Sequence, residues 1–478
     1  MGMMVVNALL ALSLAAATTA ADEMPTGCVV EKVACRSDPA FTYALYLPSA
    51  YTSARRWPVL LVFDPGARAA LGAELFREPA ERFGWIVMSS GDTRSAGVTM
   101  QHNLDAALAM LGDAGTRWAT DRSRYYAAGF SGGATLAWVV GQEAGSLAGV
   151  IGCGGPWQDG VLPERATYDH FGAAGMLDFN HAGMIRIDRL LGERGAAHRL
   201  ELFPGPHAWM PAQLAADAVA WLEVQAIRRG LRARDDALLA TLYAADGDRA
   251  RELEAGGEPL AALRRWQAVA ATFGGLVGVD RARAEAARLE ASPAVAAALA
   301  EEAKWRAFEE SYLDSMRPIL AAMLGDEPPP VPLLLRELRV PELERMAGHP
   351  GVEGATASRL LESLWSQLAV ALMPQLLERQ DYARLVPVLT IAVRIRPGTP
   401  IVLYNLACAL ARTGSSRAAL DALSRAVDAG FRNRAHIESD PDLAGLRKRK
   451  EFAQILERLA AAPAPPPTAA PALPQGAP

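Results

Sequence analysis

The residues best suited to chemistry lie in Gly129-Phe130-Ser131-Gly132-Gly133, a Gly-x-Ser-x-Gly motif. A strand-like run precedes this motif and a helical pattern follows it at once, which is typical of a nucleophile on a sharp strand-to-helix turn. Gly129 and Gly133 let the strand and the helix approach closely, and the strained turn exposes the serine hydroxyl. We therefore predict that Ser131 is a nucleophile.

A serine hydroxyl needs a histidine to remove its proton and a carboxylate to orient that histidine. In this motif context the partners follow in the order serine, acid, histidine. Asp178 follows the strand-like run 171–175 and His207 follows the run 199–203, so both should emerge beside Ser131. We predict a triad of these three residues, with a helix N-cap as the alternative role for Asp178. The remaining histidines that follow the motif within the same domain are expected on the surface, in loops or at the opposite edge of the sheet: His170, His181 and His198.

Attack on a carbonyl also needs hydrogen-bond donors for the oxyanion that forms. The backbone N–H of Gly132, directly after the nucleophile, is the first expected donor. The second should come from the loop that follows the run 58–64, where the N–H of Ala67 is favoured and that of Gly66 is the next choice. The sequence thus predicts an oxyanion hole built from two separate segments.

Aromatic residues adjoin the loops at the same predicted edge, and they are candidates for an acyl-binding or ring-binding surface: Phe130, Trp157, Phe179 and Trp209. Ordinary packing is the alternative for each of them. The intervals between the triad residues are too short for a separate cap domain, so we predict an open site.

These residues can meet only if a parallel sheet brings the ends of its strands to one edge. Between residues 40 and 225, short apolar or β-branched runs alternate with helical patterns, which predicts a mostly parallel sheet with helices on both faces. The expected strands are 41–47, 58–64, 85–89, 125–129, 149–152, 171–175 and 199–203. The predicted fold class of this part is therefore α/β.

From about residue 226 onward, strand-like runs vanish and helical periodicity dominates, so this part is expected to be all α. Within it, Leu385, Leu389, Ala392 and Pro397 recur at one fixed spacing as Ala419, Leu423, Ala426 and Phe431. The pattern is clear over about 366–432 and resembles the tetratricopeptide repeat, whose small residues let antiparallel helices pack closely. An ordinary helical bundle is the alternative.

The predicted organisation is a signal peptide over 1–21, a catalytic domain over 22–225, a helical-repeat domain over 226–461 and a disordered Ala/Pro tail over 462–478. The first segment is apolar and ends in small residues, which is typical of a cleaved secretory signal. We therefore expect a secreted or periplasmic protein, with an uncleaved apolar anchor as the alternative. The tail is too poor in large apolar residues to form a core.

Composition and charge exclude several classes of protein. Hydrophobic residues make up 51% and charged residues 21% of the chain, which suits folded domains rather than a multi-span membrane protein. The net charge is −5 and no basic stripe is present, so we expect no nucleic-acid partner. We also expect no membrane span once the signal is removed, because no other segment is judged long and apolar enough to cross a bilayer.

The four cysteines suggest one disulfide and no metal site. Cys28 and Cys35 lie close to the predicted cleavage point, where an oxidising compartment would let them pair. Cys153 and Cys408 lie in apolar contexts in different domains and are expected to be buried. No group of cysteines and histidines has ligand spacing, so we expect neither a metal nor a cofactor.

A set of motifs along residues 40–225 carries a resemblance to a known family. It comprises Tyr46-Leu47-Pro48, the run from Trp57 to Val62, Gly129 to Gly133, Gly175 to Asp178, and Gly205 to Trp209. Together they resemble the secreted α/β-hydrolase esterases related to polyhydroxybutyrate depolymerases and feruloyl esterases, a branch near dienelactone hydrolase. The resemblance implies an α/β-hydrolase sheet and a small-molecule or polymeric ester as substrate. Asp64-Pro65 departs from the loop that this family usually carries.

The sequence therefore predicts a serine esterase with a helical-repeat domain, which either binds a protein partner or shapes or covers the mouth of the active site. One alternative is a serine peptidase of the prolyl-oligopeptidase type, which shares the triad but for which no propeller or acidic clamp is evident. Another is a non-catalytic scaffold that binds partners through its repeats. The presence of all three triad residues argues against the scaffold.

Overall fold

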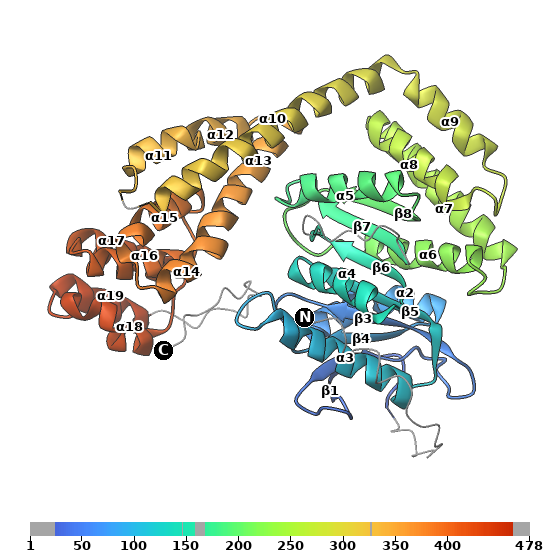
Figure 1. The fold of residues 1–478 in the computed structure, drawn as a ribbon, viewed down its shortest axis with the longest axis horizontal. Helices are drawn as coiled ribbons and strands as arrows, with labels where there is room; N and C mark the ends of the chain where they lie inside the picture. Colours follow the sequence, from blue (N-terminus) through green and yellow to red (C-terminus); the bar gives the residue numbers. More distant parts are fainter. Residues whose placement is uncertain (1–23, 146, 158–167, 326, 462–478) are drawn as a thin grey trace, which may run out of the picture.

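The computed structural model describes residues 24–145, 147–157, 168–325 and 327–461. The predicted signal peptide over 1–21 and the predicted tail over 462–478 lie outside the described residues. Figure 1 shows an α/β domain in the first part of the chain and a long run of helices after it.

The α/β domain is built on an eight-stranded sheet with the order β1-β2-β4-β3-β5-β6-β7-β8. β2 runs antiparallel to its two neighbours, and every other strand pair is parallel. The strands are β1 (Val29–Ala34), β2 (Thr42–Tyr46), β3 (Trp57–Phe63), β4 (Ile86–Ser90), β5 (Thr120–Phe130), β6 (Leu147–Cys153), β7 (Asp169–Gly175) and β8 (His198–Phe203). This is the α/β-hydrolase sheet that was predicted, and the fold class is confirmed.

Helices cover both faces of the sheet because its central strands are apolar on both sides. Side chains alternate along β3, so Val59 and Leu61 join one core whereas Leu60 and Val62 join the other. The first core receives residues of α3 (Met100–Arg117), α4 (Gly132–Ala144) and α5 (His181–Glu193). The second is covered by α1 (Ala69–Leu75), α2 (Arg77–Phe83) and α6 (Ala212–Arg228).

The edge strand β1 was missed by the sequence analysis, whereas the seven expected strands are all present. β1 pairs with β2 alone, and its register shifts between Val30 and Val33, so the strict alternation of a half-buried strand is interrupted. Short, irregular edge strands leave only a weak sequence signal.

The rest of the chain is helical, as predicted, and no strand occurs among the described residues after β8. The helices are α7 (Asp236–Ala255), α8 (Pro259–Phe273), α9 (Asp280–Glu290), α10 (Pro293–Met323), α11 (Val331–Glu337), α12 (Val340–Ala347), α13 (Gly351–Ser366), α14 (Met373–Glu378), α15 (Tyr382–Ile395), α16 (Pro400–Arg412), α17 (Ser416–Asp428), α18 (Arg434–Ser439) and α19 (Lys450–Ala461). The π-helix η2 (Gln367–Leu372) joins α13 to α14, and the 3₁₀ helix η3 (Pro441–Leu446) follows α18.

These helices form two separate apolar cores that α10 connects. Val295, near the start of α10, packs with α7, α8 and α9, whereas Trp305 and the residues after it pack with α11 to α19. In Figure 1, α10 accordingly extends from α9 to the second group of helices. α15, α16 and α17 pack in chain order, and their assignment to tetratricopeptide repeats stays a prediction.

The first helical core is joined to the sheet by α6. Val224 and Ile227 of α6 belong to the core of α7 to α9, and α6 continues past the predicted domain boundary at residue 225 to Arg228. The boundary therefore lies within a helix that serves both parts.

Buried charges attach α7 and α8 to the edge strand β8. Arg199 of β8 pairs with Glu201 at 2.7 Å and with Asp246 of α7 at 2.9 Å. Arg265 of α8 pairs with the same two carboxylates, at 2.9 Å from that of Glu201. The helices thus cover a sheet edge that would otherwise expose unpaired backbone groups.

The expected disulfide between Cys28 and Cys35 is not formed, and both thiols are free. The two cysteines lie at opposite ends of β1, which is 6 residues long. Because a strand rises by about 3.3 Å per residue, their Cα atoms are roughly 20 Å apart, whereas a disulfide requires about 7 Å or less. Cys153 and Cys408 are buried, as expected.

One described helical stretch, Gly351–Glu378, is long and apolar enough to cross a membrane by length and composition. This corrects the expectation that no segment after the signal passes that test. Leu360, Leu364 and Leu368 of this stretch are fully buried in the second helical core. A core helix passes the same test, so the stretch is weak evidence for a membrane span.

Candidate active site

Ser131 sits on a strained turn between β5 and α4. Its backbone has φ 53° and ψ −121°, in a region that residues other than glycine rarely occupy. A Cβ atom at Gly129 would overlap the carbonyl oxygen of Gly133, and one at Gly133 would overlap that of Phe63. The two glycines therefore permit the close approach that the sequence analysis expected, and the Ser131 N–H is anchored on the Cys153 carbonyl at 2.9 Å.

The structure brings Ser131, His207 and Asp178 into contact. His207 Nε2 lies 2.9 Å from Ser131 Oγ, and His207 Nδ1 lies 2.9 Å from both Asp178 carboxylate oxygens. An ionised carboxylate only accepts hydrogen bonds, so Nδ1–H donates to Asp178 and Nε2 is left to accept from the serine hydroxyl. The Asp178 side chain is fully buried, whereas that of His207 is 20% exposed.

The loops after β6, β7 and β8 interlock around Asp178. The N–H of Asn180 donates to Asp178 Oδ1 at 2.7 Å, and the Asn180 side-chain amide donates to the Gly154 carbonyl at 2.7 Å. Leu177 N–H donates to the Gly205 carbonyl at 2.9 Å, which joins the loop of the acid to the loop of the histidine. Asp178 thus also stabilises the turn before α5, and this local role accompanies its contact with the imidazole.

Two of the three expected oxyanion donors are engaged elsewhere. The N–H of Ala67 donates to the Asp64 carbonyl at 3.1 Å, and that of Gly66 donates to Asp64 Oδ1 at 2.8 Å. Asp64 is fully buried, and a buried carboxylate must find donors. It therefore folds the loop back on itself and also accepts from the Arg68 guanidinium at 2.8 Å and from Trp209 Nε1 at 2.8 Å.

Gly132 is the expected donor that keeps its place. It is the first residue of α4, where the backbone N–H groups have no acceptor within the helix. No hydrogen bond from its N–H is present among the described residues. The partial positive charge at this helix end adds to its ability to stabilise an anion.

Ser95 lies at the site and was missed by the sequence analysis. A Cβ atom at Gly132 would overlap the Ser95 hydroxyl, so this hydroxyl lies directly against the residue that follows the nucleophile. The Ser95 N–H donates to the Pro65 carbonyl at 3.0 Å, which ties the loop after β4 to the loop after β3. The available signal was the position of Ser95 in a polar loop after an expected strand.

The predicted aromatic surface is only partly assembled. The rings of Phe130 and Phe179 lie 4.6 Å and 4.3 Å from the His207 ring, and Trp209 lies 5.7 Å from Phe130. Trp157 instead packs into the sheet core beside Trp138 at 5.7 Å. Phe179 is half-buried and can face a substrate, whereas Phe130 is buried and supports the imidazole.

The other histidines of this domain lie away from Ser131, but not all of them are on the surface. His170 lies within β7 with 1% of its surface exposed, and burial lowers its pKa to about 3. His181 begins α5 and its pKa is lowered to about 3 by burial, then by the charges of Arg359 and Arg264. Both were expected at the surface or in loops; the structure corrects this for His170, which is buried within a strand, whereas His181 is half-buried where α5 begins. His198 starts β8, at the end of the sheet opposite the triad, as expected.

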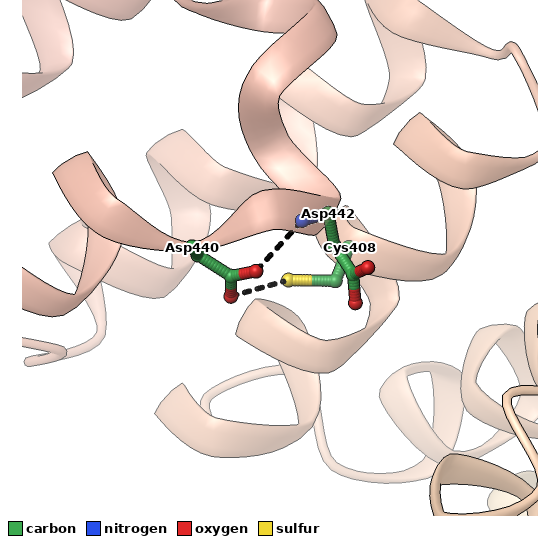
Figure 2. Close-up of side chains that lie close together, drawn as sticks. All are labelled: Cys408, Asp440 and Asp442. Atoms are coloured by element: carbon green, nitrogen blue, oxygen red, sulfur yellow. Dashed lines mark hydrogen bonds between the residues drawn. The ribbon is translucent and has the colours of Figure 1, made fainter. Parts of the chain in front are cut away.

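A second group of reactive side chains lies far from this site, between α16 and η3. The thiol of Cys408 and the carboxylates of Asp440 and Asp442 lie close enough together to surround an ion (Figure 2). Asp440 Oδ2 accepts from the Cys408 thiol at 3.6 Å and from the Tyr404 hydroxyl, and both Asp442 oxygens accept from the Tyr382 hydroxyl at 2.9 Å. These donors already satisfy the carboxylates.

Comparison with known proteins leaves the family open. No family model matches the chain. Over 55 residues, which are 12% of this chain, the sequence is 40% identical to a chloroplastic protein of Arabidopsis thaliana. The chain spans only 16% of the length of that curated relative.

Solved structures with a similar fold include several hydrolases. The S-formylglutathione hydrolase FrmB of Staphylococcus aureus has a TM-score of 0.35 and 14% identity, covering 42% of this chain and 98% of that one. An esterase of Pyrobaculum calidifontis has a TM-score of 0.36 and 12% identity, covering 43% and 87%. A ferulic acid esterase has a TM-score of 0.34 and 14% identity, covering 41% and 96%. At these values the likenesses say nothing of what this chain acts on.

Proposed function

We propose that this chain is a serine hydrolase that cleaves a carboxylic ester through an acyl-enzyme intermediate. The observation that carries the proposal is the unbroken relay from Ser131 Oγ through the two nitrogens of His207 to Asp178, with each contact at 2.9 Å. A relay of this geometry is the arrangement that activates a serine hydroxyl. The strained backbone at Ser131 supports the same interpretation, because such strain clusters at functional sites.

In the proposed reaction, Ser131 Oγ attacks the ester carbonyl carbon while His207 Nε2 takes the hydroxyl proton. The carbonyl π-electrons move to oxygen and form a tetrahedral oxyanion. Collapse of this intermediate expels the alcohol, which takes the proton from His207, and leaves an acyl group on Ser131. Water then attacks the acyl-enzyme with the same histidine as base, which releases the acid and restores the serine. Asp178 stabilises the imidazolium ion in both halves of the cycle.

The oxyanion requires at least one donor, and the Gly132 N–H at the start of α4 is suitably free. We propose the Ser95 hydroxyl as the second donor, since it lies against Gly132 and serine hydroxyls serve this purpose in other sites. Asp64 and Arg68 then act indirectly, because their bidentate pair holds the loop whose Pro65 carbonyl anchors the Ser95 N–H.

The proposed substrate is an ester with an apolar acyl or aryl group. Phe179 lies against His207, and Met176 and Leu177 in the same loop are 45% and 37% exposed. Exposed apolar side chains in the loop that carries the proposed acid favour an apolar substrate over a charged one. We further propose a secreted or periplasmic location and a protein partner for the helical part, both on the sequence grounds given above.

A fluorophosphonate probe tests the proposal directly, because it reacts only with an activated serine. We expect labelling of the wild-type chain on the peptide that contains Ser131 and none in Ser131→Ala. Hydrolysis of p-nitrophenyl esters should fall by about 10⁴-fold or more in the same variant. Ser123→Ala, which changes an exposed serine at the start of β5, is the matched control and should behave as the wild type.

The substrate panel separates the proposed esterase from its alternatives. Serine peptidases also cleave activated esters, so peptide anilides are the discriminating substrates. We expect this chain to cleave esters of increasing acyl length but not peptide anilides, whereas a peptidase would cleave both. A chain that neither reacts with the probe nor cleaves any ester would overturn the proposal and leave the scaffold.

A further inference from the structure

The second helical core, formed by the later part of α10 together with α11 to α19, is in contact with the loop that carries the proposed acid. Arg359 of α13 donates a hydrogen bond from Nη1 to the carbonyl oxygen of Met176 at 2.9 Å, although the two residues are 183 positions apart. Met176 immediately follows β7 and comes two residues before Asp178. A side chain of the helical part is therefore in direct contact with the backbone of the acid loop.

Arg359 is held in place by groups that leave its position little freedom. The Glu309 carboxylate of α10 accepts from Arg359 Nε at 2.9 Å and from Nη2 at 2.6 Å, and the Thr356 hydroxyl lies 2.9 Å from Nη2. The side chains of Arg359 and Glu309 are only 6% and 5% exposed. A buried bidentate pair fixes the plane of the guanidinium, so its remaining nitrogen is aimed at the Met176 carbonyl.

The acid loop is fixed on its other side by the segment that leads to His207. The Met176 N–H donates to the Phe203 carbonyl at 2.8 Å, and the Leu177 N–H donates to the Gly205 carbonyl at 2.9 Å. The loop is thus held between the histidine segment and Arg359. Withdrawal of the guanidinium would leave the Met176 carbonyl without this partner and loosen the loop on one side only.

Arg359 also influences a second residue of the α/β domain. His181 lies close enough to Arg359 and to Arg264 of α8 for their charges to lower its pKa, in addition to its burial. Two helices of the helical part therefore act electrostatically on the first residue of α5, three residues after the acid. This electrostatic effect adds to the hydrogen bond between Arg359 and Met176.

We propose that Arg359 is a positioning residue through which α10 and α13 hold the acid loop, and thereby Asp178, in register with His207. The proposal rests on the hydrolase function proposed above and adds a regulatory role for the helical part. Any rearrangement of α10 against α13 moves the guanidinium away from the Met176 carbonyl and lowers the turnover number without changing the substrate-binding side chains.

The test uses the full-length chain with Arg359→Met and Glu309→Met combined. Removing both charges avoids the unpaired buried carboxylate that a single substitution would leave. We expect kcat for a p-nitrophenyl ester to fall by about 10-fold, because small misplacements of catalytic groups cost up to about 100-fold. KM should change by less than about twofold, since the binding side chains are untouched.

Two readouts separate positioning from a purely structural role. The rate of fluorophosphonate labelling should fall by the same factor as kcat. The acid limb of the kcat profile should move to lower pH, because a displaced carboxylate stabilises the protonated imidazole less well. Arg359→Lys, which keeps the charge beside Glu309 but loses the guanidinium fork, should give a smaller loss in the same direction and covers the case in which the double variant does not fold.

Arg384→Met is the matched control. Arg384 also pairs with a carboxylate, that of Asp381, and donates to a distant carbonyl, that of Gly325 at 2.9 Å, but all three residues belong to the helical part. We expect wild-type kinetics in this variant. If the wild-type chain is labelled at Ser131 but folded Arg359 variants keep its kcat and pH profile, the coupling is wrong and the hydrolase stands. If the wild-type chain is not labelled, the hydrolase function itself fails.

Discussion

The chain holds two groups of side chains that look alike in composition but differ in chemistry. One combines Ser131, His207 and Asp178, and the other combines Cys408 with Asp440, while His436 Nε2 lies 3.9 Å from that carboxylate. Each therefore contains a nucleophilic residue type, a histidine and an aspartate. Only in the first does the histidine stand between the nucleophile and the acid.

In the second group, the order of the contacts leaves the cysteine without a histidine to activate it. The Cys408 thiol donates directly to the Asp440 carboxylate, which is a weak base, and no imidazole lies between them to accept its proton. Burial and the charges of Asp440 and Asp442 raise the pKa of this thiol well above its ordinary value, which keeps it protonated. Cys408 also lies in the middle of the regular helix α16, whereas Ser131 occupies a strained turn. Connectivity and backbone conformation, rather than residue types, distinguish a site from a structural cluster.

The largest effect expected from this comparison follows the removal of the charge that orients His207. Asp178→Asn should lower kcat by about 10⁴-fold, because the amide favours the wrong tautomer of the imidazole. Ester hydrolysis and the rate of fluorophosphonate labelling both measure this loss.

Asp188→Asn is the control for this change, since Asp188 lies 3.6 Å from His198 in an aspartate–histidine contact outside the site. It should keep the wild-type rate. A similar loss in both variants would show that the aspartates matter only for folding.

Much of this first group could be predicted because its signals are local in sequence. Ser131 is marked by flanking glycines that a close strand–helix approach requires, and Asp178 and His207 each follow an apolar run that the structure shows as β7 or β8. Buried parallel strands give continuous apolar runs, and parallel strands bring their carboxyl ends to one edge. Chain order and sheet geometry then limit the choice to a few residues.

The oxyanion loop could not be predicted in the same way, because its shape depends on a distant partner. Asp64 accepts from Trp209, which is 145 positions away, and this buried carboxylate also draws in the N–H of Gly66. Residue types around position 64 show only that the loop is unusual. The contact of Arg359 with Met176 has the same origin, since no local pattern reports which helix meets which loop.

The next largest effect concerns the donor that replaces the expected loop. Ser95→Ala should lower kcat by about 10- to 100-fold with little change in KM, since the hydroxyl is proposed to act only on the oxyanion. Steady-state kinetics with a p-nitrophenyl ester measure both constants.

Thr99→Ala is the control, because Thr99 lies close along the chain and caps α3 through its contact with the His102 N–H at 3.2 Å. Loss of this cap should reduce thermal stability but leave kcat unchanged. An unchanged kcat in Ser95→Ala would return the second donor to Ala67 or Gly66, whose N–H groups would then have to leave Asp64 when substrate binds.

The smallest effect on activity is expected at Cys408, which belongs to the group that we do not expect to be catalytic. Cys408→Ala should leave ester hydrolysis within about twofold of the wild type, and it should lower the free energy of unfolding by about 1 to 2 kcal/mol through the lost contact with Asp440.

In the native wild-type chain at neutral pH, iodoacetamide should modify the exposed Cys28 well before Cys408, because the reactive form is the thiolate. Peptide mass mapping over time distinguishes the two thiols. Rapid alkylation of Cys408 would mean that a thiolate forms there despite its burial among carboxylates, and the contrast between the two groups would then rest on the strained backbone of Ser131 alone.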